Sequence, residues 1–160
     1  MLRTVLFLSC LVPLCPSPAV AEGVLFVLDQ SQLPFDLGPG ARANSPANVR
    51  NAPSQFPNSA GNRANAAGAP GNAPSNSANA PGGANAVYTP DGDYAGYAVQ
   101  AGGALNLFSA GGRRVAYQPA GGHTKSLFSI QGQWCGTVSR DATGGHAFGM
   151  TLECARRVFD

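Results

Sequence analysis

Two Gly-Gly-His sequences and two cysteines are the residues of this chain whose types could form a metal site. His123 and His146 each follow a glycine pair, and Cys135 and Cys154 lie in the same part of the chain. Two imidazoles and two thiolates are a set that binds zinc tetrahedrally. The same sulfurs could instead form a disulfide, which an oxidising compartment favours, or stay as buried thiols that never meet. We expect a Cys135–Cys154 disulfide and no cofactor, with the zinc site as an alternative.

Serine, histidine and aspartate residues could also combine into a nucleophilic triad. The candidates are Ser126 or Ser129 as nucleophile, His123 or His146 as base, and Asp141 as the group that orients the base. No Gly-x-Ser-x-Gly sequence precedes a helix to present the nucleophile. We therefore expect no enzymatic activity, and a small secreted hydrolase stands as an alternative.

Aromatic side chains are the remaining candidates for a binding site. Aromatic rings in hairpin repeats can hold sugar rings or cations, and Tyr94 and Trp134 are the two residues that we assign to such a role. Repeats that bind cell walls are much richer in Trp and Tyr than this chain, which has one Trp and four Tyr. Core packing therefore explains most of the aromatic residues better, and a carbohydrate- or cell-wall-binding module is an alternative function.

Residues 1–21 have the pattern of a secretory signal peptide. Arg3 precedes an apolar run, and Ala19-Val20-Ala21 supplies the small residues of a cleavage site. Prolines interrupt the run, which ends at Glu22 and falls short of the roughly 20 residues that span a membrane. Cys10 and Cys15 lack the preceding small residues that lipoprotein processing favours. We expect cleavage after Ala21, a secreted or periplasmic protein that does not span the membrane, and a ligand in the cell envelope or outside the cell.

The charge of the chain argues against nucleic acid as a partner. Charged residues make up 11% of the chain, and its net charge is +2. A nucleic-acid footprint needs Lys and Arg clustered on one face. Here only Arg113-Arg114 and Arg156-Arg157 form pairs, and paired arginines in a small domain are usually solvated. We expect no nucleic-acid partner, and the sequence names no other.

Two segments precede the part of the chain that resembles a folded domain. Within the short apolar segment 22–38, residues 23–28 have the length and composition of a strand. This strand either pairs with the C-terminal domain or extends the hydrophobicity of the signal. Residues 39–86 are almost entirely Ala, Asn, Pro, Gly and Ser, which cannot bury enough apolar area to offset the loss of backbone entropy. The sequence predicts a disordered linker over 39–86, in which the recurring Asn-Ala-Pro reflects compositional bias.

A motif that returns at a fixed interval of about 20 residues organises the predicted domain, 87–160. Each copy begins with two apolar residues, at Val87, Leu107 and Leu127, and has a glycine at its sixth place. Fixed-period similarity indicates one supersecondary unit copied in tandem, and glycine supplies the positive φ of a tight hairpin turn. We expect three hairpins, a seventh strand over 147–152 and an eighth over 155–159, and hence an all-β domain.

A small residue stands four places after each turn position, at Gly96, Ala116 and Gly136. A position that admits only Gly or Ala indicates backbones that approach closely. We therefore expect the strands of successive copies to pack around a shared axis.

The segment Leu107 to Tyr117, and less closely Leu127 to Val138, resembles the four-fold β-flower domain, a family of small bacterial modules built from tandem hairpins. The resemblance covers about residues 87–155 and rests on the pattern aromatic-x-x-x-Gly-x-x-Val-Ala-Tyr. It implies a compact pseudo-symmetric β fold without an assigned biochemical role. The fourth copy departs from the pattern, which leaves closure of the fold open. We expect an exported β-repeat module that acts by binding or display.

Overall fold

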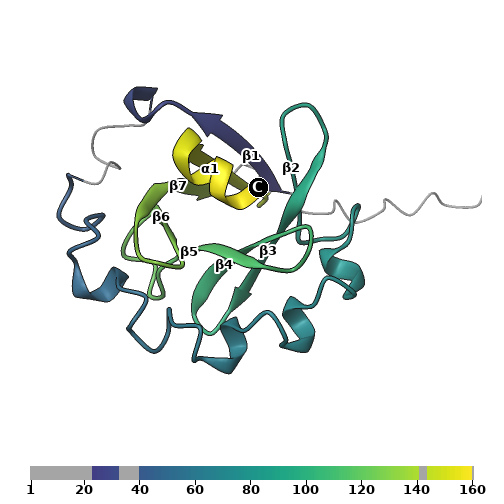
Figure 1. Cartoon of the computed structure of the whole chain (residues 1–160), viewed down its shortest axis with the longest axis horizontal. Helices are drawn as coiled ribbons and strands as arrows, with labels where there is room; N and C mark the ends of the chain where they lie inside the picture. Colours follow the sequence, from purple (N-terminus) through teal and green to yellow (C-terminus); the bar gives the residue numbers. More distant parts are fainter. Residues whose placement is uncertain (1–22, 33–39, 141–143, 160) are drawn as a thin grey trace, which may run out of the picture.

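The computed structural model describes residues 23–32, 40–140 and 144–159. The predicted signal peptide, its cleavage site and Asp141 lie outside these residues. Within them, eight strands form a closed barrel in which strands adjacent in sequence are adjacent in the sheet (Figure 1). They are β1 (Gly23–Leu28), β2 (Ala86–Tyr88), β3 (Tyr94–Ala101), β4 (Ala104–Ser109), β5 (Arg114–Gln118), β6 (Ser126–Ser129), β7 (Trp134–Arg140) and β8 (His146–Thr151), followed by helix α1 (Leu152–Phe159). The prediction of an all-β fold is confirmed.

The hairpins β2–β3, β4–β5 and β6–β7 share one irregularity in strand register. The register shifts after Val87, Leu107 and Leu127, which are the equivalent first positions of the three repeats. The residues opposite these positions are Gly96, Ala116 and Gly136. Each hairpin therefore carries its bulge at the same place on its second strand, where one extra residue, Ala95, Val115 or Cys135, directly precedes the small residue.

Two of these small residues lie where backbones approach closely, as predicted. A Cβ on Gly96 would lie 2.1 Å from the carbonyl oxygen of Phe108, and a Cβ on Gly136 would lie 1.9 Å from that of Gly149. Both distances are far below any real contact. At these two positions a side chain would displace the neighbouring strand.

Strand β1 closes the barrel, which answers the question that the sequence left open for residues 23–28. It runs parallel to β8, pairing Val24 with Ala147 and Leu28 with Thr151, and parallel to β2. The edge of β8 is therefore occupied when the chain leaves β8. The predicted strand over 155–159 is wrong because no edge is left for it to pair with, and these residues belong to α1. Among the described residues, no helix is long and apolar enough to cross a membrane.

Residues 41–83, which we call the asparagine belt, follow the outside of the barrel (Figure 1). Six asparagines recur at every seventh position, and all are at most 4% exposed: Asn44, Asn51, Asn58, Asn65, Asn72 and Asn79. The backbone N–H of each bonds to the carbonyl three positions earlier, at 2.8–2.9 Å. Four of these turns are short 3₁₀ helices, Val49–Asn51, Arg63–Asn65, Pro70–Asn72 and Ser77–Asn79; a further one, Gln30–Gln32, follows β1.

The belt consists of seven-residue units, each containing one of these buried asparagines. The asparagine side chains connect each unit to the unit before it. The Nδ2 of Asn65 donates to the carbonyls of Pro57 and Ser59, at 2.7 and 3.1 Å. The same pair of bonds, to the residues that flank the preceding asparagine, recurs at Asn51, Asn58, Asn72 and Asn79. The prediction of a disordered linker over 39–86 is wrong for the described part of that range. The buried asparagine amides stabilise the belt in place of apolar packing, because they donate hydrogen bonds to backbone carbonyls in each successive turn.

The barrel and the belt are joined through a layer of aromatic side chains. Leu107, Leu127 and their neighbours form the apolar core with Cys154 and Ala155 of α1, and the adjacent residues Phe108 and Phe128 point to the opposite face of their strands. There Phe108 stacks on Tyr97 and Phe128 packs against Tyr117, with ring centroids 5.1 and 6.1 Å apart. All four rings are buried.

The two repeats fit each other because three belt units match one hairpin. The Tyr97 hydroxyl donates to the carbonyl of Asn72, and the Tyr117 hydroxyl to that of Asn51, both at 2.6 Å. A step of one hairpin along the barrel thus corresponds to a step of three units, in the opposite direction, along the belt. Tyr94 and Arg114, which are also one hairpin apart, donate to the carbonyls of Asn79 and Asn58 in the same relation.

Candidate functional site

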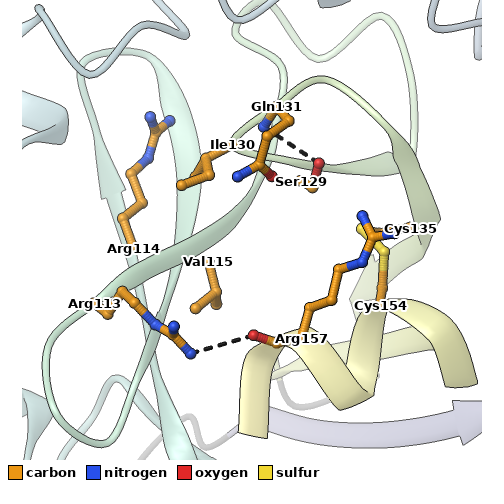
Figure 2. Close-up of a pocket in the computed structure, with 9 residues that line it drawn as sticks. All are labelled: Arg113, Arg114, Val115, Ser129, Ile130, Gln131, Cys135, Cys154 and Arg157. Carbon is orange, nitrogen blue, oxygen red and sulfur yellow. Dashed lines mark hydrogen bonds between the residues drawn. A yellow bond between two sulfur atoms is a disulfide. The ribbon is translucent and has the colours of Figure 1, made fainter. Parts of the chain in front are cut away.

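A cavity of about 140 Å³ lies where α1 meets the turns of the second and third hairpins (Figure 2). The β4–β5 turn supplies one wall, the β6–β7 turn a second, and the disulfide with α1 a third. The lining residues are Arg113, Arg114, Val115, Ser129, Ile130, Gln131, Cys135, Cys154 and Arg157. No acidic residue lines the cavity within the described residues.

The wall next to α1 is the Cys135–Cys154 disulfide, so this prediction is confirmed. Cys135 lies on β7 and Cys154 on α1, with their Cα atoms 5.5 Å apart. The bond fastens an eight-residue helix, too short to be stable by itself, to the barrel. Two disulfide-bonded sulfurs cannot ligate zinc as thiolates, which removes the sulfur ligands of the alternative metal site.

Two arginines reach the cavity from opposite walls. Arg113 Nη2 donates to the backbone carbonyl of Arg157 at 3.2 Å, near the end of α1, where helical carbonyls lack partners within the helix. Arg157 in turn donates through Nη1 to Gln133 Oε1. Arg113 and Gln133 occupy equivalent places in successive hairpins. The two turns therefore hold Arg157 between them.

Among the described residues that line the cavity, every charged side chain is an arginine. Arg157 pairs with Glu153 at 2.6 Å, but 49% of the Arg157 side chain and 77% of the Glu153 side chain are exposed. An exposed pair of this kind on one helix contributes little, so water or a ligand can replace the carboxylate. The apolar part of the lining comes from Val115 and from Ile130, which is 40% exposed. A cavity with two guanidinium groups beside an apolar wall is suited to an anionic group attached to a carbon skeleton.

Arg114 belongs to the barrel–belt joint and does not add its charge to the cavity. Its Nε donates to Asn106 Oδ1 at 2.7 Å and its Nη2 to the carbonyl of Asn58 at 2.8 Å, and Figure 2 shows its guanidinium turned away from Arg113. Burial lowers the pKa of Arg114 from its ordinary value, and the adjacent Tyr117 acts in the opposite direction. Burial raises the pKa of Tyr117 to about 12, against the effect of Arg114.

The two histidines of the predicted metal site line different cavities, both apart from the disulfide. His123 Nε2 contacts Asn51 Oδ1 at 2.8 Å and lines a cavity of about 270 Å³ next to Arg50. His146 stacks on Phe148 and lines a cavity of about 190 Å³. In the described part of the chain, no three His, Cys, Asp or Glu residues are grouped so as to bind a metal ion.

The candidate nucleophiles make structural hydrogen bonds. Ser126 Oγ accepts from Trp134 Nε1 at 3.0 Å. Ser129 Oγ accepts from the backbone N–H groups of Gln131 and Gln133, at 3.3 and 3.2 Å, and so stabilises its own hairpin turn. Asp141, the third member of the hypothetical triad, lies outside the described residues. The contacts of the two serine hydroxyls do not favour a catalytic role.

The candidate sugar-binding residues, Tyr94 and Trp134, lie on β3 and β7, which are not neighbours in the barrel. The Tyr94 hydroxyl donates to the belt at Asn79, and its ring packs edge-on against Tyr88. Burial, and to a smaller extent Tyr88, raises the pKa of Tyr94. Trp134 is half-buried and its one donor is bonded to Ser126. Each ring therefore has a structural role, and the two do not form one platform.

The sequence analysis missed Arg113 and Arg157, because it treated both arginine pairs as solvated surface. The structure brings one member of each pair to the same cavity across 44 residues of sequence. The spacing of these arginines from the cysteines and from the hairpin turns could have indicated their position. If Cys135 binds Cys154, the arginine three places after Cys154 must lie beside the turn that precedes Cys135, and the hairpin period places Arg113 in the adjacent turn.

Comparisons of the chain with protein-family models, with curated proteins and with solved structures found no match. The resemblance to the four-fold β-flower family therefore stays a prediction.

Proposed function

We propose that this protein is an exported, non-enzymatic binding module whose ligand presents a carboxylate or sulfate group to the cavity between Arg113 and Arg157. The observation that carries the proposal is the convergence of these two side chains, from different hairpin and helix elements, on one cavity without an acidic lining residue in the described chain. Guanidinium groups bind carboxylate and sulfate oxygens through parallel N–H donors.

The size of the cavity favours recognition of one group of a larger ligand. At about 140 Å³ it is smaller than the roughly 300–1,000 Å³ of a site that encloses a whole small molecule. Val115 and Ile130 would contact the carbon skeleton next to the anionic group. A carboxylate on a peptide or on an acidic sugar has this combination of charge and adjoining carbon.

Export is part of the proposal. A disulfide and the absence of a membrane-spanning helix among the described residues are compatible with an extracellular or periplasmic protein. We expect the mature protein to begin at Glu22, immediately before β1. Sequencing the amino terminus of protein recovered from the culture medium or periplasm tests this, and material that starts at Met1 would contradict it.

The ligand class can be tested by titrating the protein with acetate, succinate and methyl sulfate, with acetamide as the neutral match for acetate. We expect the anions to shift the backbone amide resonances of residues 113–115 and 129–131 in heteronuclear NMR spectra, and acetamide to leave them unchanged. Arg113→Gln and Arg157→Gln should each weaken binding tenfold or more, since each removes one of two charges. Arg140→Gln removes an exposed charge elsewhere and serves as the matched control.

Three results would direct attention to another function. Equal shifts with acetamide, or equal losses in Arg140→Gln, would show that the cavity does not select anions. Binding of neutral sugars on a glycan array, lost in Trp134→Ala, would favour the carbohydrate-binding alternative. A hydrolase activity that disappears in His123→Ala or His146→Ala would favour the enzymatic one.

A further inference from the structure

The belt presents one residue per unit to solvent at the same place in every unit. This outward position lies two places before each buried asparagine, and all six of its residues are exposed: Arg42, Val49, Phe56, Arg63, Pro70 and Ser77. The regular turns of the belt place them in a row along its outer side. Because each precedes a buried asparagine by the same two places, their side chains all face away from the barrel.

The first four members of this row are larger than the belt requires. Pro70 and Ser77 occupy the outward position in units with the same 3₁₀ turn and the same asparagine bonds, so the fold needs nothing bulky there. Val49 and Phe56 are nevertheless each 68% exposed. Exposed aliphatic and aromatic side chains in a segment otherwise made of small residues indicate an interaction surface.

The charge around these two apolar residues has one sign. Arg42 and Arg63 flank them in the row, and Arg50 lies next to Val49 on the edge of the cavity of about 270 Å³. Residues 40–85 contain no Asp or Glu. Among the described residues these three arginine side chains have no hydrogen-bond or ion-pair partner within the protein. Among the described residues, no acidic side chain neutralises the positive charge of this surface, which is therefore complementary to an anionic partner.

We propose that the outward row of the belt, Arg42 to Arg63 with Arg50, docks the protein on an anionic phospholipid surface. Phosphate groups of the lipid would contact the arginines, while Val49 and Phe56 enter the boundary between head groups and acyl chains. Cations and exposed apolar side chains alternating on one face are the combination by which peripheral proteins bind anionic bilayers. A soluble polyanion would match the charge but would leave Val49 and Phe56 in water.

This surface is separate from the cavity at α1. The belt contributes none of the residues that line that cavity. Docking through the belt would therefore leave the proposed anion site available, and the two proposals can fail independently.

The test is co-sedimentation of the purified protein with vesicles of phosphatidylglycerol mixed with phosphatidylcholine, and with vesicles of phosphatidylcholine alone. We expect binding to the anionic vesicles, reduced by high salt, and at least tenfold weaker binding to the neutral ones. Arg42→Gln/Arg50→Gln/Arg63→Gln should weaken the anionic binding at least tenfold. The control Lys125→Gln/Arg140→Gln/Arg156→Gln removes the same number of exposed charges away from the belt and should stay within twofold of the parent protein.

The apolar contribution distinguishes lipid from other polyanions. Val49→Ser/Phe56→Ser should weaken vesicle binding at least fivefold, while Pro70→Ser, at the same place in another unit, should leave it unchanged. Binding that the serine variant retains in full, or that dextran sulfate supports as well as vesicles do, would overturn the lipid proposal. Thermal unfolding of each variant checks that the fold is intact, and the positions are exposed enough for Tm to stay within about 2 °C.

Discussion

Replacing Asn65 by alanine tests whether the belt is part of the cooperative fold. The side chain is fully buried, donates to the carbonyls of Pro57 and Ser59, and accepts from Asn106 Nδ2 at 3.0 Å. Each such bond contributes about 1 kcal/mol net, and a buried carbonyl left without a donor costs more. Asn106 keeps two weaker acceptors. We expect Asn65→Ala to lower the free energy of unfolding by about 3 kcal/mol.

The measurement is urea unfolding followed by circular dichroism, with Asn76→Ala as the matched control. Asn76 lies in the same belt but is half-buried, and its side chain accepts only from the N–H of Ala78, at 3.0 Å. Loss of such a cap costs about 1 kcal/mol. For a chain of this size the expected difference between the two variants, about 2 kcal/mol, corresponds to roughly 6 °C in Tm.

Two results would refute the reasoning. One is an Asn65→Ala variant no less stable than Asn76→Ala, which would mean that the buried amide bonds do not contribute to folding. The other is rapid trypsin cleavage of the native protein after Arg50 and Arg63 with release of a stable fragment that begins near residue 87. That pattern is what a disordered linker would give, whereas a folded belt should be cut only as the protein unfolds.

Three other changes have effects that follow from single contacts. Replacing Cys135 and Cys154 together by alanine should lower the free energy of unfolding by about 3 kcal/mol, since the bond closes a loop of 19 residues; a reducing agent should reproduce this loss in the parent protein and do nothing to the variant. Burial raises the pKa of Tyr117 to about 12 from its ordinary value of 10.0, so the stability it contributes is complete below pH 10 and is lost, by roughly 3 kcal/mol in all, as the pH rises from 10 through 12; urea unfolding of Tyr117→Phe should show a smaller decrease over that interval. Gly136→Ala should cost more than about 3 kcal/mol or prevent folding, because its Cβ would lie 1.9 Å from a carbonyl oxygen of the facing strand; Gly111→Ala, whose Cβ meets nothing within 4 Å, should be neutral in the same thermal assay.

Local sequence was enough to predict the hairpins. Alternating apolar residues, turn glycines and the fixed repeat period specify strands and tight turns from residues close together in the chain, so β2 to β7 and the close approach at Gly96 and Gly136 could be predicted. The Cys135–Cys154 pairing could also be predicted, because removal of the predicted signal peptide would leave only two cysteines in the chain. In each case the interaction joins residues that are close together in the chain, or the residue has only one possible partner.

The asparagine belt was predicted wrongly, although its period of seven is visible in the sequence. An argument from composition counts apolar area, and the belt has almost none. Its order comes from amide bonds to carbonyls six and eight places earlier and from barrel groups such as Tyr97 and Tyr117, which lie 25 and 66 residues away from their acceptors. Whether those carbonyls are satisfied is known only once the barrel is in place.

The tertiary structure likewise decided the conformation of the last segment and which residues line the cavity. Residues 152–159 form a helix because β1, from the other end of the described chain, already occupies the edge of β8. Arg113 and Arg157 line the same cavity because the disulfide holds that helix against the two hairpin turns. The sequence by itself determined the units of this protein, since their turns and strands are set by neighbouring residues. Tertiary packing decided which edges, carbonyls and charges of those units meet, because these contacts join residues that are far apart along the chain.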